Sequence, residues 1–135
     1  MSEMTMAKKD MELKGPSVVL LTADLQGSIA YYRGLGFEYE DIGGHAHLTR
    51  GTVCFILHPV PNASDVRPSS TVEGGLYFDL FCYGDAVAIY EEFVAKGVEI
   101  VNGPHFGGGW NEFTMRDVNG YRIAFGGNNE TEAKG

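Results

Sequence analysis

The sequence is poor in basic residues, and this shortage argues against two classes of partner. Its 135 residues include 10 Lys and Arg against 18 Asp and Glu, which gives a formal net charge of −8. Nucleic acid and anionic membranes carry negative charge and would be repelled, so we expect neither as a partner. A neutral or cationic small molecule suits this charge better. Acidity that serves solubility alone is the alternative, and composition by itself favours it.

Long apolar runs and a cysteine framework are also missing. No stretch approaches the roughly 20 apolar residues of a membrane-spanning helix, and the N-terminal residues lack the apolar block of a signal peptide. The two cysteines, Cys54 and Cys82, lie within apolar runs, where a free thiol behaves as a small hydrophobe. These features predict a cytoplasmic protein with structural cysteines.

Recognisable catalytic patterns are absent as well. The chain has no Ser-His-Asp arrangement, and the glycines at 107–109 lack the strand-to-helix context of a phosphate-binding loop. We therefore nominate no catalytic residue. Apolar residues make up 44% of the chain, which is enough for one core, and we expect a single domain over residues 16–127. Residues 1–14 and 128–135 are expected to be flexible termini.

The first half of this domain, about residues 16–60, begins with an apolar run that predicts a buried strand at 17–22. Asp24 follows where a helix N-cap is expected, and the helix ends at Gly34 or Gly36. Runs rich in β-forming residues then predict strands at 37–42, 45–50 and 52–59.

The second half, about residues 75–127, repeats this order. A strand is expected at 75–83, then a helix capped by Asp85 and ended by Gly97. Three more strands are expected at 98–102, 110–116 and 121–126, and residues 59–74 form a connector rich in Pro, Ser and Gly. The predicted fold class is α+β, with two tandem β-α-β-β-β units forming a curled mixed sheet.

Two stretches give the chain a family resemblance: Asp-Leu-Gln-Gly-Ser-Ile-Ala-Tyr-Tyr at 24–32 with Leu-Gly-Phe at 35–37, and Arg-Asp-Val-Asn-Gly at 116–120. With the repeated element order, they resemble the glyoxalase, bleomycin-resistance and extradiol-dioxygenase (vicinal oxygen chelate) superfamily. The segment from Glu112 to Gly120 is similar to the corresponding part of bleomycin resistance proteins. It departs from the family at Val118, where proline is usual.

The resemblance implies that metal enzymes of the superfamily place ligands on the concave faces of the sheets. Carried over one at a time, the four ligand positions fall on Ser17, Ile56, Phe78 and Ala124. Ile, Phe and Ala offer no N or O donor to a divalent metal, and among the neighbouring residues only Asp79 offers a customary ligand. We therefore expect no metal and no cofactor at the inherited site.

Strand alternation predicts which side chains share the concave face. A hairpin with Gly120 in its turn pairs Thr114 with Ala124 and Met115 with Ile123, so that Met115 and Ile123 face the helices. The other face is expected to carry Trp110, Glu112, Thr114, Arg116, Arg122 and Ala124, joined by Val19, Leu21, Cys54, Ile56, His58, Phe78, Leu80 and Cys82.

An apolar cavity with a few polar groups is typical of a small-molecule site. The ligand-binding residues that we predict are Phe78, Trp110, Glu112, Ile56, His58, Arg122 and Thr114. Phe78 and Trp110 would stack on a ligand, Glu112 would pair with a cationic group, and His58 and Arg122 would hold polar atoms.

Each of these roles has a structural alternative. Trp110 would then cover the glycine loop at 107–109, Glu112 would form an ion pair with Arg116 or Arg122, and Phe78 and Ile56 would fill core.

Two other groups are candidate sites. His45 and His47 project from one strand face at a spacing that permits metal chelation, but no third ligand is evident, so a solvated role is favoured. Asp79 is expected to point toward the helices and to bind the hydroxyl of Tyr31 or Tyr32.

The resulting functional hypothesis is a metal-independent small-molecule binding protein that sequesters an apolar or cationic compound, as the resemblance to bleomycin resistance proteins implies. The resemblance also implies a homodimer. The alternative is an enzyme: a lyase or dioxygenase with relocated metal ligands, or a metal-free isomerase that uses Glu112 or His58 as a base.

Overall fold

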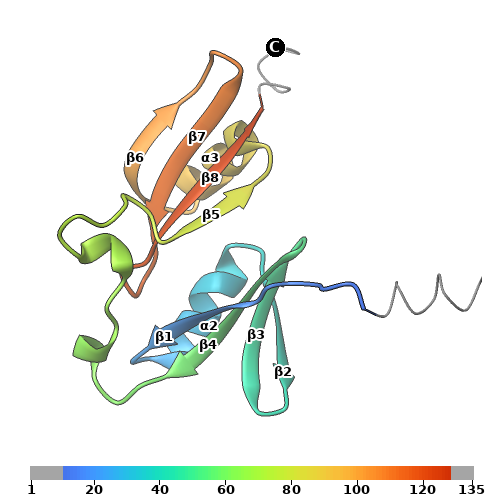
Figure 1. Ribbon diagram of the computed structural model, residues 1–135, viewed down its shortest axis with the longest axis vertical. Helices are drawn as coiled ribbons and strands as arrows, with labels where there is room; N and C mark the ends of the chain where they lie inside the picture. The colour runs from blue at the N-terminus through green and yellow to red at the C-terminus, as the bar shows by residue number, and fades with distance from the viewer. Residues whose placement is uncertain (1–10, 129–135) are drawn as a thin grey trace, which may run out of the picture.

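The computed structural model of the protein describes residues 11–128 and contains two similar halves joined by a connector (Figure 1). The first half consists of β1 (Val18–Thr22), α2 (Leu25–Gly34), β2 (Glu38–Ile42), β3 (His45–Arg50) and β4 (Val53–Pro59). The second consists of β5 (Leu80–Tyr83), α3 (Ala86–Ala95), β6 (Glu99–His105), β7 (Trp110–Arg116) and β8 (Arg122–Asn128). The connector contains two short 3-10 turns, Ala63–Asp65 and Ser69–Thr71. The predicted α+β fold of two β-α-β-β-β units is confirmed.

Each half forms its own four-stranded mixed sheet. The strand orders are β1-β4-β3-β2 and β5-β8-β7-β6, and the first two strands of each sheet run parallel. The two sheets lie one above the other in Figure 1, and neither is closed into a barrel. The predicted pairing of Thr114 with Ala124 and of Met115 with Ile123 is confirmed.

Helix caps that the sequence predicts are present in both halves. The Asp24 carboxylate accepts a hydrogen bond from the Gly27 N–H at 3.0 Å, and the Asp85 carboxylate accepts one from the Ala88 N–H at 3.2 Å. Gly97, at φ 77°, takes the left-handed conformation that ends α3. These caps place the two helices at equivalent points of the two halves.

One apolar cluster draws on both halves, and each helix packs against its own sheet. Tyr32, Phe37 and Phe55 contribute rings from the first half, and Phe93 and Phe113 contribute rings from the second. All five are at least nine-tenths buried. The face of each sheet away from this cluster is the concave face on which a ligand site is predicted.

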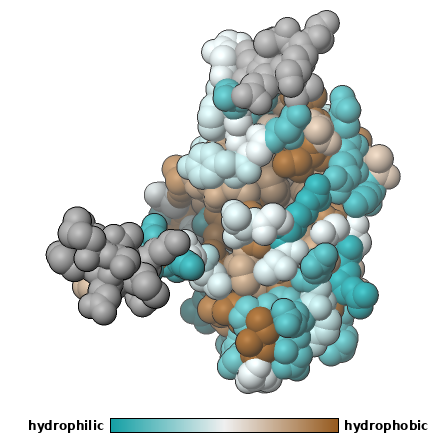
Figure 2. Space-filling model, turned by 90° about the vertical axis from the view of Figure 1, so that its right-hand side faces the viewer, coloured by the Kyte–Doolittle hydropathy of each residue, from teal (hydrophilic) through white to brown (hydrophobic). Residues whose placement is uncertain are grey.

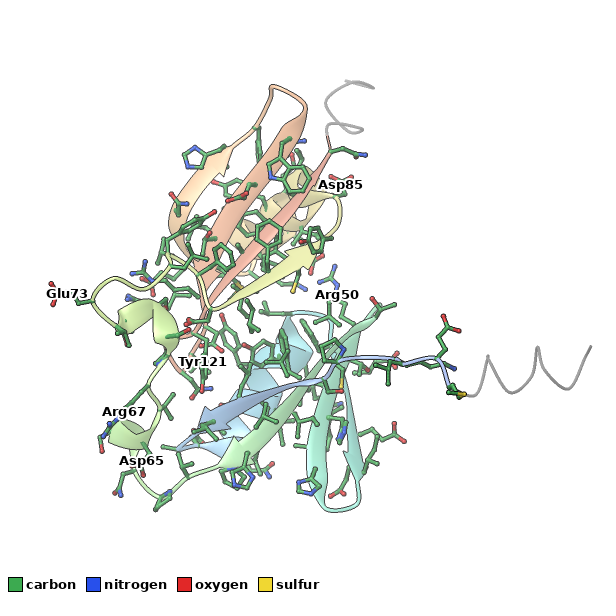
Figure 3. All side chains as sticks on the ribbon, viewed as in Figure 1. Arg50, Asp65, Arg67, Glu73, Asp85 and Tyr121 are labelled. Atoms are coloured by element: carbon green, nitrogen blue, oxygen red, sulfur yellow. The ribbon has the colours of Figure 1, made fainter. Side chains whose placement is uncertain are left out.

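Polar contacts also join the halves. Arg50 donates two hydrogen bonds to the Glu92 carboxylate, both at 2.9 Å, and the Tyr121 hydroxyl accepts one from the Leu21 N–H at 2.9 Å. Arg50 and Tyr121 lie in Figure 3 where the upper and lower halves meet.

The strand predicted at 75–83 is shorter than expected, because β5 begins only at Leu80. The Asp79 carboxylate accepts hydrogen bonds from the hydroxyls of Ser69 and Ser70, at 2.9 and 2.7 Å, and therefore ties the preceding segment to the connector. The prediction that Asp79 binds Tyr31 or Tyr32 is wrong.

The expected flexibility of residues 1–14 and 128–135 concerns segments that fall mostly outside the described residues.

The predicted orientation of β5 is also wrong. Leu80 pairs with Ile123 and Cys82 with Phe125, and partners in a parallel pair share a face, so both point toward the helix. The helix-facing residue Leu20 lies four positions before its cap Asp24, but Cys82 lies only three before Asp85. Because the spacing between strand and helix cap is one residue shorter in the second half, each β5 side chain points to the opposite face from the one predicted by analogy with β1. Phe81 and Tyr83 take the concave positions instead.

Candidate functional site

The concave face of the second sheet gathers aromatic side chains around one carboxylate. Trp110, Glu112 and Thr114 lie on β7, next to Ala124 and Gly126 on β8. Phe81 and Tyr83 flank these β8 residues from β5. All of them lie on the face opposite α3, because the intervening Phe113 and Ile123 belong to the core.

Glu112 is held by two aromatic side chains. Its Oε1 accepts a hydrogen bond from the Trp110 indole N–H at 3.0 Å, and its Oε2 accepts one from the Tyr77 hydroxyl at 2.5 Å. The hydrogen bond to Glu112 raises the pKa of Tyr77. The expected ion pair of Glu112 with Arg116 or Arg122 is not formed, and Arg116 pairs with Glu99 instead.

Trp110 and Phe81 form a paired aromatic surface. Their ring centroids are 6.3 Å apart and their planes differ by 28°. Both rings lie against Gly126, where an added Cβ would come within 2.6 Å of Trp110 Cζ2 and 2.7 Å of Phe81 Cζ. Trp110 remains 42% exposed, so its ring is available to a ligand. Glycine is therefore needed at position 126 for these rings to reach the sheet.

A groove of about 450 Å³ borders this aromatic surface. It is lined by Tyr83, Gly84, Asp85, Trp110, Gly126, Gly127 and Asn128. Asp85, labelled in Figure 3, is the N-cap of α3 and places an acidic residue in the lining of this groove. The groove therefore combines aromatic walls with negative charge, which suits a cationic group.

The Thr114 hydroxyl lies on the same face as Glu112 and is fully buried. Among residues 11–128 it has no hydrogen-bond partner. A buried polar atom of this kind is uncommon, because desolvation is not offset by a new hydrogen bond.

The other predicted site residues divide between the two sheets. The Phe78 ring packs edge-on against Phe81, with centroids 5.4 Å apart, and the Arg122 backbone N–H donates to Asp79. Ile56 and His58 lie on β4, in the first sheet. Five of the predicted site residues therefore lie on or against the second sheet: Phe78, Trp110, Glu112, Thr114 and Arg122. Ile56 and His58 lie on the first sheet instead.

Sequence reasoning missed Tyr77, Phe81 and Tyr83. The signal was present, since four of the seven residues at 77–83 are aromatic. The assumed alternation of β5, however, assigned the concave positions to Leu80 and Cys82.

The residues at the inherited metal positions do not fit a metal. Of the four inherited positions, Ser17, Ile56, Phe78 and Ala124, only Ser17 carries an oxygen. Val19 and Phe81, which pair with Ile56 and Ala124, add no donor atom. In the described part of the chain, no group of three His, Cys, Asp or Glu could hold a metal ion. Burial raises the pKa of the Cys82 thiol to about 11, so the thiol stays protonated.

The histidine pair on β3 is engaged locally. The His47 ring nitrogen Nδ1 lies 3.2 Å from the backbone oxygen of His45, which is an exposed residue at the start of the strand. The two imidazoles have no third ligand beside them in the part of the chain that the structure covers.

A comparison with known protein families identifies the superfamily to which the chain belongs. The profile of the Glyoxalase/Bleomycin resistance protein/Dioxygenase superfamily matches residues 16–125. The chain belongs to this superfamily. A comparison with curated proteins gave no match.

Several solved structures share the fold at low sequence identity. A bleomycin resistance determinant encoded on the transposon Tn5 is 19% identical, with a TM-score of 0.63 over 86% of this chain and 98% of that one. An integron cassette protein from V. cholerae is 23% identical, with a TM-score of 0.62 over 87% and 97%. A putative glyoxalase family protein from Bacillus anthracis is 16% identical, with a TM-score of 0.61 over 87% and 97%.

None of the described helices is long and apolar enough to cross a membrane.

Proposed function

We propose that this superfamily member binds a small organic cation with an aromatic part on the concave face of its second sheet, and sequesters it without a metal. The observation that carries the proposal is the Glu112 carboxylate, which lies between Trp110 and Tyr77 and beside the paired Trp110 and Phe81 rings. A carboxylate can pair with the positive group, and aromatic faces attract cations through their quadrupole.

Three further features support this proposal. The net charge of −8 attracts cations over a distance that salt screening limits. Sequestration requires binding alone, so hydrophobic residues at the inherited ligand positions do not impair it. The structural likeness to a bleomycin resistance determinant agrees with a drug-sequestering role, and a cytoplasmic location belongs to the same proposal.

The sole tryptophan of the chain makes this proposal directly testable. Titration of the protein with a panel of aromatic organic cations should change the emission of Trp110. Glu112→Gln should weaken binding of the compounds that respond by about tenfold, because a charge-assisted contact is lost. Glu91→Gln, on an exposed position of α3, serves as the control and should leave affinity unchanged.

Failure of every compound to perturb Trp110, or equal affinity of Glu112→Gln and the wild type, would contradict the proposed site. Independence from metal is tested separately. Protein purified without chelator should contain no stoichiometric transition metal, and added chelator should not change affinity. Stoichiometric metal that disappears in His45→Ala or His47→Ala would overturn the metal-free proposal and favour an enzyme with relocated ligands.

A homodimer is part of the proposal. Val19 and Ile42 in the first sheet are 56% and 47% exposed, and Tyr83 in the second is 77% exposed. Figure 2 shows apolar surface among polar side chains on one side of the molecule. Burial of such side chains favours association of two copies. Sedimentation equilibrium should give twice the mass of the chain, and a monomer at all concentrations would contradict this part.

A further inference from the structure

The floor of the second sheet's concave face holds a buried hydroxyl that none of the described residues satisfies. Thr114 is 0% exposed, and its Oγ1 has no hydrogen-bond partner in the described chain. Its cross-strand partner Ala124 is likewise 0% exposed and contributes only a methyl group. Buried hydroxyls in native proteins are nearly always paired, so an unpaired one beside a binding surface indicates where a ligand atom can bind.

The side chain of Tyr77 reaches across the second sheet to Glu112. Tyr77 precedes β5, whereas its partner Glu112 lies on β7, and β8 separates the two strands. Asp79, just after Tyr77, binds the N–H of Arg122 at the start of β8. The Thr114–Ala124 pair lies between the Arg116–Arg122 pair and the Glu112–Gly126 pair, so we infer that Tyr77 passes over Thr114 and Ala124 on its way to Glu112.

Two contacts hold Tyr77 in place: its hydrogen bond to Glu112 and an edge-on contact with the Phe78 ring, whose centroid is 4.8 Å away. The residue is 40% exposed, and the segment before β5 belongs to no strand. Its hydroxyl occupies Oε2 of Glu112, which is the position that an N–H of a cationic ligand would need. Tyr77 and the ligand therefore compete for the same acceptor, and the apparent affinity depends on the fraction of molecules in which Tyr77 has moved away.

We propose that Tyr77 is a lid over a second polar subsite, an inference that rests on the proposed function. A planar organic cation displaces Tyr77 from Glu112 and hydrogen-bonds through another polar atom to the Thr114 hydroxyl. Glu112 and Thr114 are two positions apart on one strand face, so their side chains are separated by about 7 Å. The favoured ligand is therefore an aromatic cation that carries a hydroxyl or carbonyl at a similar distance from its charge.

Two probes separate the contribution of each subsite. Benzamidine carries an amidinium that pairs with a carboxylate, and 4-hydroxybenzamidine adds a hydroxyl across the ring from it. Affinities are measured by calorimetry together with Trp110 emission. Tyr77→Phe should tighten binding of both probes by about fivefold, because the competing hydrogen bond is lost. Thr114→Val should weaken 4-hydroxybenzamidine by about fivefold and leave benzamidine unchanged.

Matched controls are available on the first sheet. Tyr39→Phe removes the hydroxyl of a tyrosine that is also 40% exposed, and Thr49→Val makes the same change on β3. Neither should alter binding. Unchanged affinity in Tyr77→Phe would overturn the lid, and an equal effect of Thr114→Val on both probes would overturn the subsite. Either result, with binding still weakened in Glu112→Gln, leaves the proposed function standing. Absence of binding by both probes to wild type and Tyr77→Phe alike would overturn the cation site together with the lid.

Discussion

The hydroxyl of Tyr32 on α2 donates a hydrogen bond to the carboxylate of Asp117, in the turn between β7 and β8. The contact joins the first half of the chain to the second inside the core, since Tyr32 is 1% and Asp117 6% exposed. Burial raises the pKa of Asp117, while hydrogen bonds from Tyr32 and from the N–H groups of Asn119 and Tyr121 oppose that rise. The buried carboxylate therefore depends on its donors.

Tyr32→Phe should lower the free energy of unfolding by about 1–3 kcal/mol, because a buried carboxylate loses a donor. Urea denaturation followed by circular dichroism measures this change. Tyr31→Phe is the control, because the Tyr31 hydroxyl makes no hydrogen bond within residues 11–128, and its effect should stay within about 0.5 kcal/mol. Equal losses in the two variants would show that the Tyr32 hydroxyl has no special role.

The ion pair between Arg50 and Glu92 predicts a dependence of stability on pH. Hydrogen bonds from Arg50 and Lys96 lower the pKa of Glu92 from 4.5 to about 2. Since the pKa is lower in the folded state, the stabilisation is complete above about pH 4.5 and is lost as the pH falls toward about 2. The Glu92 side chain is 32% exposed, so screening reduces the effect to about 1–2 kcal/mol.

Glu92→Gln should therefore cost about 1–2 kcal/mol at pH 7, and the difference should shrink below about pH 4.5 and vanish once the pH passes below about 2. Unfolding free energies of both proteins across this range give the comparison. Glu91→Gln changes the neighbouring, exposed carboxylate and should run parallel to the wild type at every pH. A constant difference between Glu92→Gln and wild type would exclude titration of Glu92 as the cause.

Local patterns were sufficient to predict most of the fold. The caps at Asp24 and Asp85 depend on hydrogen bonds to residues three positions away, and the register at Thr114 depends on the turn containing Gly120. Such interactions can be read from neighbouring residues. The element order and the pairing of β7 with β8 were predicted for this reason.

Contacts between distant segments could not be read in the same way. Asp79 binds Ser69 and Ser70 of the connector, and this contact shortens β5. The shift by one position between Cys82 and its helix cap then reverses the face of each β5 residue. Tyr77 reaches Glu112 across an intervening strand, so the site's principal hydrogen bond was not predictable from spacing.

Thr114 should be a position where stability and binding conflict. Because its buried hydroxyl has no partner within residues 11–128, Thr114→Val should raise the free energy of unfolding of the ligand-free protein by about 1 kcal/mol. Thr49→Val, at a partly exposed strand position, should stay within about 0.5 kcal/mol. Thermal or urea unfolding decides between these values. Destabilisation by Thr114→Val would mean that the hydroxyl already has a favourable environment in the free protein.

Gly126 should be essential to the aromatic surface although it has no side chain to contact a ligand. An alanine methyl there would meet Trp110 at 2.6 Å and Phe81 at 2.7 Å, so at least one ring must move. Gly126→Ala should weaken binding of aromatic cations by tenfold or more and alter Trp110 emission. It should also destabilise the fold by about 1–3 kcal/mol, which is the usual cost of overpacking.

Gly34→Ala is the matched control for this change. An added Cβ at Gly34, in α2, meets no atom within 4 Å, so affinity and Trp110 emission should be unchanged. Stability should be equal to that of the wild type or higher by up to about 1 kcal/mol, because alanine favours the helix. If Gly126→Ala binds cations as tightly as Gly34→Ala does, the paired rings of Trp110 and Phe81 cannot be the surface on which the ligand stacks.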